Sequence, residues 1–90
     1  MAAPGWWVGA TCRKERIPLS VFFGRDTVNK ARGICKECPV RIRCLTDHLD
    51  EPFGVWGGHP RDERTQIMSA IEDGTSIRQA STAINSRRLR

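Results

Sequence analysis

The chain has 90 residues, which is enough for one domain but leaves no room for a second hydrophobic core. Leu, Ile, Val and Phe together make 19 of these residues, and this share of about 21% lies just above the level at which disorder is expected. The sequence has no apolar run long enough to span a membrane, and its net charge of +5 indicates an acidic partner such as nucleic acid.

The N-terminal third is predicted to be largely irregular. Residues 1–25 carry several aromatic side chains without a sustained period, so we expect no more than one helical turn there. Asp26 or Thr27 suits the N-cap of a short helix that runs toward Ile34, and Gly33 weakens its end.

A second helix is predicted to begin at Pro39, because the first helical position does not need the N–H that proline lacks. Its apolar positions are Ile42, Leu45 and Leu49. Pro52 and the segment 54–58 end it, since three glycines in five residues indicate a tight turn with positive φ values.

Two further helices are predicted after this turn. Pro60 starts one, with Asp62 and Glu63 in its first turn, and Gly74 ends it. Its apolar stripe is Ile67, Met68 and Ile71. Ser76 can cap a last helix, whose apolar positions are Ile77, Ala80 and Ile84. The expected fold class is all-α, a small irregular domain of about four short helices.

Four cysteines offer the cross-link that a small domain with a weak core generally needs. The first residues, 1–7, carry neither the charged start nor the apolar stretch of a secretory signal, so we expect a cytoplasmic protein. Disulfides are rare in a reducing cytoplasm, and clustered thiols there are interpreted first as metal or cluster ligands.

The spacing of the cysteines leaves three interpretations open. Cys35, Cys38 and Cys44 lie within ten residues, and the loop after Cys12 is long enough to bring that thiol back to them. An iron–sulfur cluster is one reading. Structural zinc is the second, although its sites usually combine two close pairs. Redox disulfides are the third, although a thioredoxin-like pair would need a βαβ context.

Cations surround the cysteines in the sequence. Arg13, Lys14, Lys36, Arg41 and Arg43 are among the cations that lie within three residues of a cysteine. They could lower the pKa of the thiols and offset the charge of a cluster of about −2. The alternative is an ordinary solvated basic face.

Several short motifs together resemble the WhiB-like proteins of actinobacteria and their phages. The resemblance runs from about Trp6 to Arg64. It rests on Ala10-Thr11-Cys12, Phe22-Phe23, Cys35-Lys36-Glu37-Cys38-Pro39-Val40-Arg41, Cys44-Leu45, Gly54-Val55-Trp56-Gly57-Gly58 and Glu63-Arg64. Each motif alone is unspecific, but four cysteines in this order followed by this glycine turn make a specific set.

The resemblance implies a helical fold around a 4Fe-4S cluster with Cys12, Cys35, Cys38 and Cys44 as ligands. It implies a cluster-binding and sigma-factor-binding domain over 1–74, followed by a basic helix or tail over 75–90. The expected partner is region 4 of the primary sigma factor of RNA polymerase, and the outcome is regulated transcription. The implied sigma contacts are Trp56, Phe22, Phe23, Gly57 and Gly58. Family members are described as sensing oxygen or nitric oxide through the cluster.

The sequence departs from the family pattern after the glycine turn. His59 and Pro60 replace the Leu-Ser or Leu-Thr typical of the family, so the rim of the sigma site is expected to differ. We expect His48 and His59 to be surface residues rather than ligands, because four cysteines already complete a site. Glu63 and Arg64 are expected to support the first helical turn or a local ion pair.

The tail after Gly74 carries four arginines and no acid. These residues are Arg78, Arg87, Arg88 and Arg90. They are candidate promoter DNA contacts, since arginine recognises phosphates and the minor-groove potential. The alternative is a solvated helix end, because cations also favour a helix C-terminus.

Exposed aromatic residues are the other candidate contacts. Trp56 has little local cover in a glycine turn, so it either enters the core or meets a partner. Phe22 and Phe23 are consecutive and cannot both point the same way, so one should lie beside the cluster. For Trp6 and Trp7 we expect one core ring and one exposed ring.

The leading functional hypothesis is a transcriptional regulator that is not an enzyme and that has no small-molecule substrate and no membrane partner. Its main alternative is a thiol–disulfide reductase, in which Cys35 and Cys38 work in a cluster-free form that can carry a disulfide. A zinc-stabilised DNA-binding module is the third class.

Overall fold

A computed structural model describes residues 9–88 as a small helical domain. The helices are α1 (Thr11–Lys14), α2 (Ser20–Phe23), α3 (Val28–Lys36), α4 (Arg41–Asp47), α5 (Arg61–Glu72) and α6 (Ile77–Arg88). Over these residues the only β-type pairing is one isolated bridge between Trp56 and His59. The all-α prediction is therefore confirmed.

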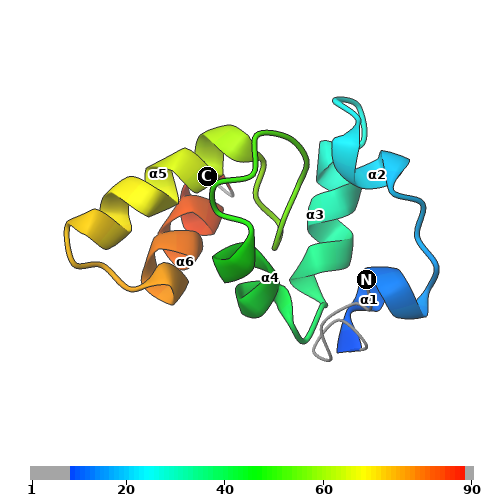
Figure 1. Cartoon of the computed structure of the whole chain (residues 1–90), viewed down its shortest axis with the longest axis horizontal. Helices are drawn as coiled ribbons and strands as arrows, with labels where there is room; N and C mark the ends of the chain where they lie inside the picture. The colour runs from blue at the N-terminus through cyan, green and yellow to red at the C-terminus, as the bar shows by residue number, and fades with distance from the viewer. Residues whose placement is uncertain (1–8, 89–90) are drawn as a thin grey trace.

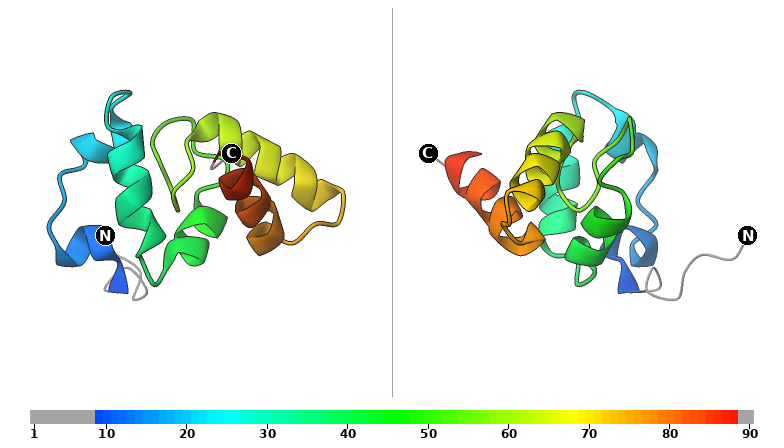
Figure 2. Two further views of the ribbon diagram at one scale, coloured as in Figure 1. Left: turned by 180° about the vertical axis from the view of Figure 1, so that it is seen from behind. Right: turned by 60° about the vertical axis from the view of Figure 1, so that its left-hand side comes forward.

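The helices form two groups with α4 and the loop after it between them (Figure 1). Helices α1 and α2 both contact α3, whereas α6 contacts α5 and, less extensively, α4. Figure 2 shows α5 and α6 lying side by side in both of its views. Within the described part of the chain, no helix is both long enough and apolar enough to cross a membrane.

Two small hydrophobic cores correspond to these groups. The first contains Val21, Phe22, Ala31, Cys35 and Val55, and the second contains Leu45, Ile67, Ala80 and Ile84. The expectation of a single core was therefore wrong, because the loop between α4 and α5 divides the apolar residues into two sets. Each core is too small to stabilise the folded domain by itself.

The N-terminal segment contains two helical turns, α1 and α2, where the sequence predicted one. Neither has a capping side chain, and the second is held by contacts with its surroundings. The backbone N–H of Val55 donates to the carbonyl of Phe22 over 2.7 Å. The hydroxyl of Thr27 donates to the carbonyl of Val21 over 2.7 Å rather than capping α3. Because these hydrogen-bond partners lie outside α2, the helix leaves no periodic pattern in the sequence.

The later helices follow the predictions more closely. Helix α4 begins at Arg41, two residues after the predicted start at Pro39. Gly74, with a φ of +96°, follows the end of α5. Ser76 caps α6 as predicted, because its hydroxyl accepts the N–H of Gln79 over 3.1 Å while the Gln79 amide oxygen accepts the N–H of Ser76. Of the predicted apolar stripe of α5, Ile67 is fully buried and Ile71 is 38% exposed.

Arg64 holds the loop between α4 and α5 in place. Its side chain is completely buried, and its guanidinium donates to the backbone carbonyls of His48, Leu49, Glu51, Gly54 and His59. Burial lowers the pKa of this guanidinium. The role goes well beyond the helix support that the sequence predicted, because a planar group with five N–H donors can satisfy several carbonyls of one loop.

Candidate functional site

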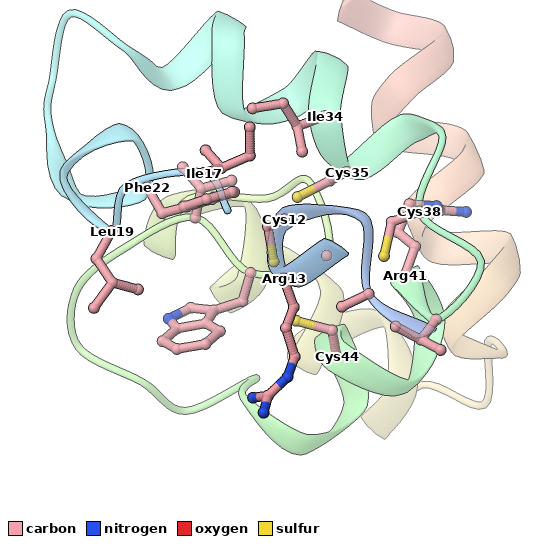
Figure 3. A pocket seen from close by; sticks show the side chains of 15 residues that line it. Cys12, Arg13, Ile17, Leu19, Phe22, Ile34, Cys35, Cys38, Arg41 and Cys44 are labelled. Carbon is pink, nitrogen blue, oxygen red and sulfur yellow. The ribbon is translucent and has the colours of Figure 1, made fainter. Parts of the chain in front are cut away.

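All four cysteines line one cavity of about 260 Å³. They come from α1 (Cys12), α3 (Cys35), the α3–α4 turn (Cys38) and α4 (Cys44). Figure 3 shows their sulfur atoms around one space, with Ile17, Phe22 and Ile34 among the apolar walls. All four are free thiols. The fold thus brings together residues that are up to 32 positions apart.

Cys12, Cys35 and Cys44 are difficult to ionise in this cysteine cavity without a bound cation. Burial raises the pKa of Cys35 to about 12 and that of Cys44 to about 11, and it also raises the pKa of Cys12. Repulsion among the four sulfurs adds to this effect. The expectation that nearby cations lower these pKa values is wrong for the three thiols. A metal centre would replace the protons and relieve the repulsion.

Backbone N–H groups already point at two of the sulfurs. Trp56 and His59 exchange two backbone hydrogen bonds of 3.1 Å each, which closes a two-residue turn over Gly57 and Gly58. Both glycines have positive φ, +59° and +87°, as a type I′ turn requires. Their N–H groups bond the sulfurs of Cys44 and Cys35, respectively, and lower the pKa of these thiols. Successive N–H groups of this kind stabilise anionic sulfur.

The arrangement of the thiols bears on which inorganic group they would hold. Across residues 9–88, no three His, Cys, Asp or Glu side chains stand close enough to hold one metal ion. A single zinc needs all its thiolates about 2.3 Å from one centre, whereas a cluster distributes its thiolates over several irons. Four thiols around a shared cavity, with N–H groups directed at them, fit the cluster better.

An aromatic surface lies at the outer side of this cavity. Trp56 is half-buried, and its ring stacks on His48 with centroids 3.9 Å apart and meets Phe23 edge-on at 6.1 Å. Its indole N–H donates to the carbonyl of Phe53 over 2.9 Å. The side chains of Leu19 and Phe53 are about three-quarters exposed, and Phe23 is 51% exposed. Leu19, Phe23, Phe53 and Trp56 are called the aromatic face below.

The predicted sigma contacts divide into exposed and buried residues. Phe22 is buried and lines the cysteine cavity, while Phe23 is exposed, so the two rings diverge as expected. Gly57 and Gly58, which form the turn, are buried. Trp56 is partly covered by His48 and Phe23, which is more local cover than the sequence suggested. Only Trp56 and Phe23 of this set offer surface to a partner.

Helix α6 carries the described part of the basic tail. Arg78 and Arg87 are exposed, and Arg87 donates to the side chain of Gln66 over 3.4 Å. The side chain of Arg88, the residue Arg90 and the pair Trp6 and Trp7 lie outside the described structure.

A buried polar network behind the glycine turn is not apparent from the sequence. His59 is fully buried, so its predicted surface position was wrong. Its Nδ1 lies 2.8 Å from Glu63, and its Nε2 lies 2.7 Å from the hydroxyl of Ser81 in α6. Glu63 also pairs with Arg32, and Ser81 accepts from Arg41 over 2.9 Å. The departure from the family pattern at His59 was the only signal of this network.

Comparison with known proteins agrees with this geometry. The family described as "Transcription factor WhiB" matches residues 6–67. Transcriptional regulator WhiD of Streptomyces coelicolor is 36% identical over 74 residues, which cover 70% of this chain and 64% of WhiD. WhiB4 of Mycobacterium tuberculosis is 34% identical over 64 residues, covering 69% and 54%. WhiB7 of Mycolicibacterium smegmatis is 46% identical over 74 residues, covering 69% and 72%.

The chain thus spans less than two thirds of the length of WhiD and of WhiB4. The matched region nevertheless includes all four cysteines, the glycine turn and most of α5. A family match over more than half of its residues, with relatives at these identities, means that the chain belongs to the WhiB family of transcription factors.

Proposed function

We propose that this protein regulates transcription by binding region 4 of the primary sigma factor through its aromatic face, with a 4Fe-4S cluster holding that face in shape. In this proposal residues 1–74 bind the cluster and the sigma factor, and residues 75–90 form a basic helix and tail that contacts promoter DNA. The relatives named above are transcriptional regulators, which supports the general assignment.

The observation that carries the proposal is the direct connection between the cysteine cavity and the aromatic face. Phe22 and Trp56 line the cavity. Their neighbours in the sequence extend this connection, because Phe23 belongs to the aromatic face and Gly57 belongs to the glycine turn. A centre held by Cys12, Cys35, Cys38 and Cys44 would join α1, α3 and α4 at one point. Loss of that centre would therefore disturb the face itself.

The donor set fits a cluster. Four thiols match the four Cys ligands of a 4Fe-4S group, which would add a redox-active centre to the protein when it is bound. Gly57 and Gly58 would donate N–H bonds to two ligand sulfurs, while Phe22 and Ile34 would keep water away from the centre.

The aromatic face fits a protein partner. Tryptophan and phenylalanine are enriched at interface positions that contribute most binding energy, and exposed apolar patches mark such sites. In this proposal Trp56 and Phe23 contact the sigma factor. The buried residues Phe22, Gly57 and Gly58 do not contact it but hold the rings of Trp56 and Phe23 in position.

The burial of Cys35 makes it unsuited to be the attacking thiol of a reductase. The attacking thiol of such an enzyme needs a lowered pKa, whereas burial raises the pKa of Cys35 to about 12. We therefore keep the non-enzymatic proposal.

The test is a comparison of Trp56→Ala with Cys38→Ala, both purified without oxygen and titrated against sigma region 4. Trp56→Ala should keep its cluster absorbance and helicity but lose about 2 to 4 kcal/mol of binding free energy, as expected for a tryptophan hot spot. Cys38→Ala should lose cluster, helicity and binding together.

The matched control is Ile71→Ala, because Ile71 is also an exposed apolar side chain but lies on α5, away from the aromatic face. It should bind sigma region 4 like the unmodified protein. Normal binding by Trp56→Ala would place the interface elsewhere, and loss of its cluster would make Trp56 a core residue instead.

A further inference from the structure

A second, basic pocket shares Arg41 and Gly57 with the lining of the cysteine cavity. It has a volume of about 270 Å³, and its walls come from α3, the start of α4, the turn and α6. The lining side chains are Arg32, Lys36, Arg41 and Asn85, with Gly33, Gly57 and Gly58 as backbone walls. Three cations and an amide thus surround the space, and no acidic residue is among its described lining.

Two of the three cations of this basic pocket, Arg32 and Arg41, are held in place by side-chain contacts. Arg41 donates to the buried hydroxyl of Ser81 over 2.9 Å. Arg32 donates to Asn29 over 3.1 Å and is paired with Glu63. Its Nε is a buried donor that has no partner among the described residues. An unsatisfied buried donor on a cation is costly unless an acceptor is supplied.

Arg41 also connects the basic pocket to a neighbouring polar depression of about 480 Å³. Arg43 and Arg78 line that depression together with Arg41. The two hollows therefore place cations from α3, α4 and α6 in one continuous band. A ligand with several anionic groups in a row would match the band better than an isolated anion would.

We propose that the basic pocket binds a phosphate group of the DNA backbone, with Lys36, Arg32 and Asn85 as its donors and Arg41 shared with the next hollow. Guanidinium groups suit phosphate because they offer paired N–H donors in one plane. The basic pocket itself contains none of the tail arginines, although Arg78 lines the neighbouring hollow. The proposal rests on the proposed function only in taking DNA as the source of the phosphate.

The test uses the full chain with its cluster, titrated with a labelled DNA duplex at several salt concentrations. Lys36→Gln removes one pocket cation, and Lys30→Gln is its matched control, since Lys30 is exposed on the same helix but does not line the pocket. Lys36→Gln should reduce the slope of log affinity against log salt by about 0.9, and Lys30→Gln should not.

A second variant adds charge without changing size. Asn85→Asp places an acid in the basic pocket and should weaken DNA binding at least as much as Lys36→Gln does. Arg87→Gln, outside the pocket, reports the tail contact separately. Cluster absorbance and sigma region 4 binding should stay unchanged in all these variants, so a failure of the proposed function would appear in those two readouts instead.

If the slope of log affinity against log salt is equal for Lys36→Gln and Lys30→Gln, the proposal is wrong, because DNA affinity would then depend only on the net charge of the protein. An absence of DNA binding by the unmodified protein, with sigma binding intact, would overturn it too. The last measurement is the binding of inorganic phosphate to the same variants. If Lys36→Gln and Asn85→Asp weaken phosphate binding but leave DNA binding unaltered, the pocket takes a free anion and its assignment to DNA is wrong.

Discussion

Gly57 is the position where the backbone leaves least room. Its φ is +59°, and a Cβ built there would lie 2.6 Å from the Cβ of Leu45 and 2.7 Å from the carbonyl oxygen of Arg41. Side chains other than that of glycine are disfavoured at positive φ by roughly 1 to 2 kcal/mol even without such contacts. The N–H of the same residue bonds the sulfur of Cys44. One glycine thus serves both the turn and the cysteine cavity.

Gly57→Ala should therefore destabilise the protein by about 2 kcal/mol or more, through strain and through displacement of α4. Gly33→Ala is the matched control, since Gly33 lies within α3 and a Cβ there would meet nothing within 4 Å. That change should stabilise by about 0.5 to 1 kcal/mol. Denaturant unfolding measures both, and equal stability of the two variants would contradict this account of the turn.

Single residues were predictable where the chemistry is local. The positive φ of Gly54, Gly57 and Gly58 followed from three glycines in five positions, and the divergence of Phe22 and Phe23 followed from their adjacency. The burial of His59 did not. Its partners lie in α5 and α6, four and 22 residues away, and sequence spacing does not say which distant hydroxyl will face an imidazole.

At the scale of elements, α6 is attached to the rest of the molecule by both apolar and polar contacts. Ala80 and Ile84 enter the second core, and Ser81 joins His59 and Arg41 to the helix. Because Arg41 also lines the cysteine cavity, this polar connection runs from the cavity to the helix that carries the proposed DNA contacts.

Ser81→Ala tests this connection. It removes the acceptor of Arg41 and the partner of His59 Nε2, and it should destabilise the protein by about 1 to 3 kcal/mol, as expected when buried polar groups lose their partners. Ser86→Ala is its matched control, an exposed serine in the same helix. If thermal unfolding of the two variants is indistinguishable, the network contributes nothing to the attachment of α6.

The C-terminal end of α5 could be predicted because Gly74 marks it, and the start of α6 could be predicted because the capping residue Ser76 marks it. Helices α1 and α2 could not. They are four residues long, carry no capping side chain and depend on contacts with α3 and with the loop that contains Val55. Short helices stabilised by tertiary contacts leave no periodic pattern.

At the scale of the whole molecule, the two cores differ in their dependence on the cysteines. The first core includes Cys35 and borders the cysteine cavity, whereas the second core contains no cysteine. An empty cavity would leave the first core with uncoordinated thiols and with few apolar contacts to offset its conformational entropy.

Removal of the cluster by a chelator, with the thiols kept reduced, should therefore unfold α1 to α3 while α5 and α6 keep partial protection. Far-ultraviolet circular dichroism should show a clear loss of helicity, and amide hydrogen exchange should locate it. Unchanged protection of α3 would show that the cluster is not needed for the first core.

The proposed shape of the aromatic face depends most on which group the cysteine cavity holds. The direct measurement is the iron, sulfide and zinc content of protein purified without oxygen, together with its visible absorption spectrum. We predict about four irons and four sulfides per chain, with charge-transfer absorption from the cluster and negligible zinc. About one zinc per chain with a colourless protein would contradict the cluster, and the protein would then be a zinc-stabilised module.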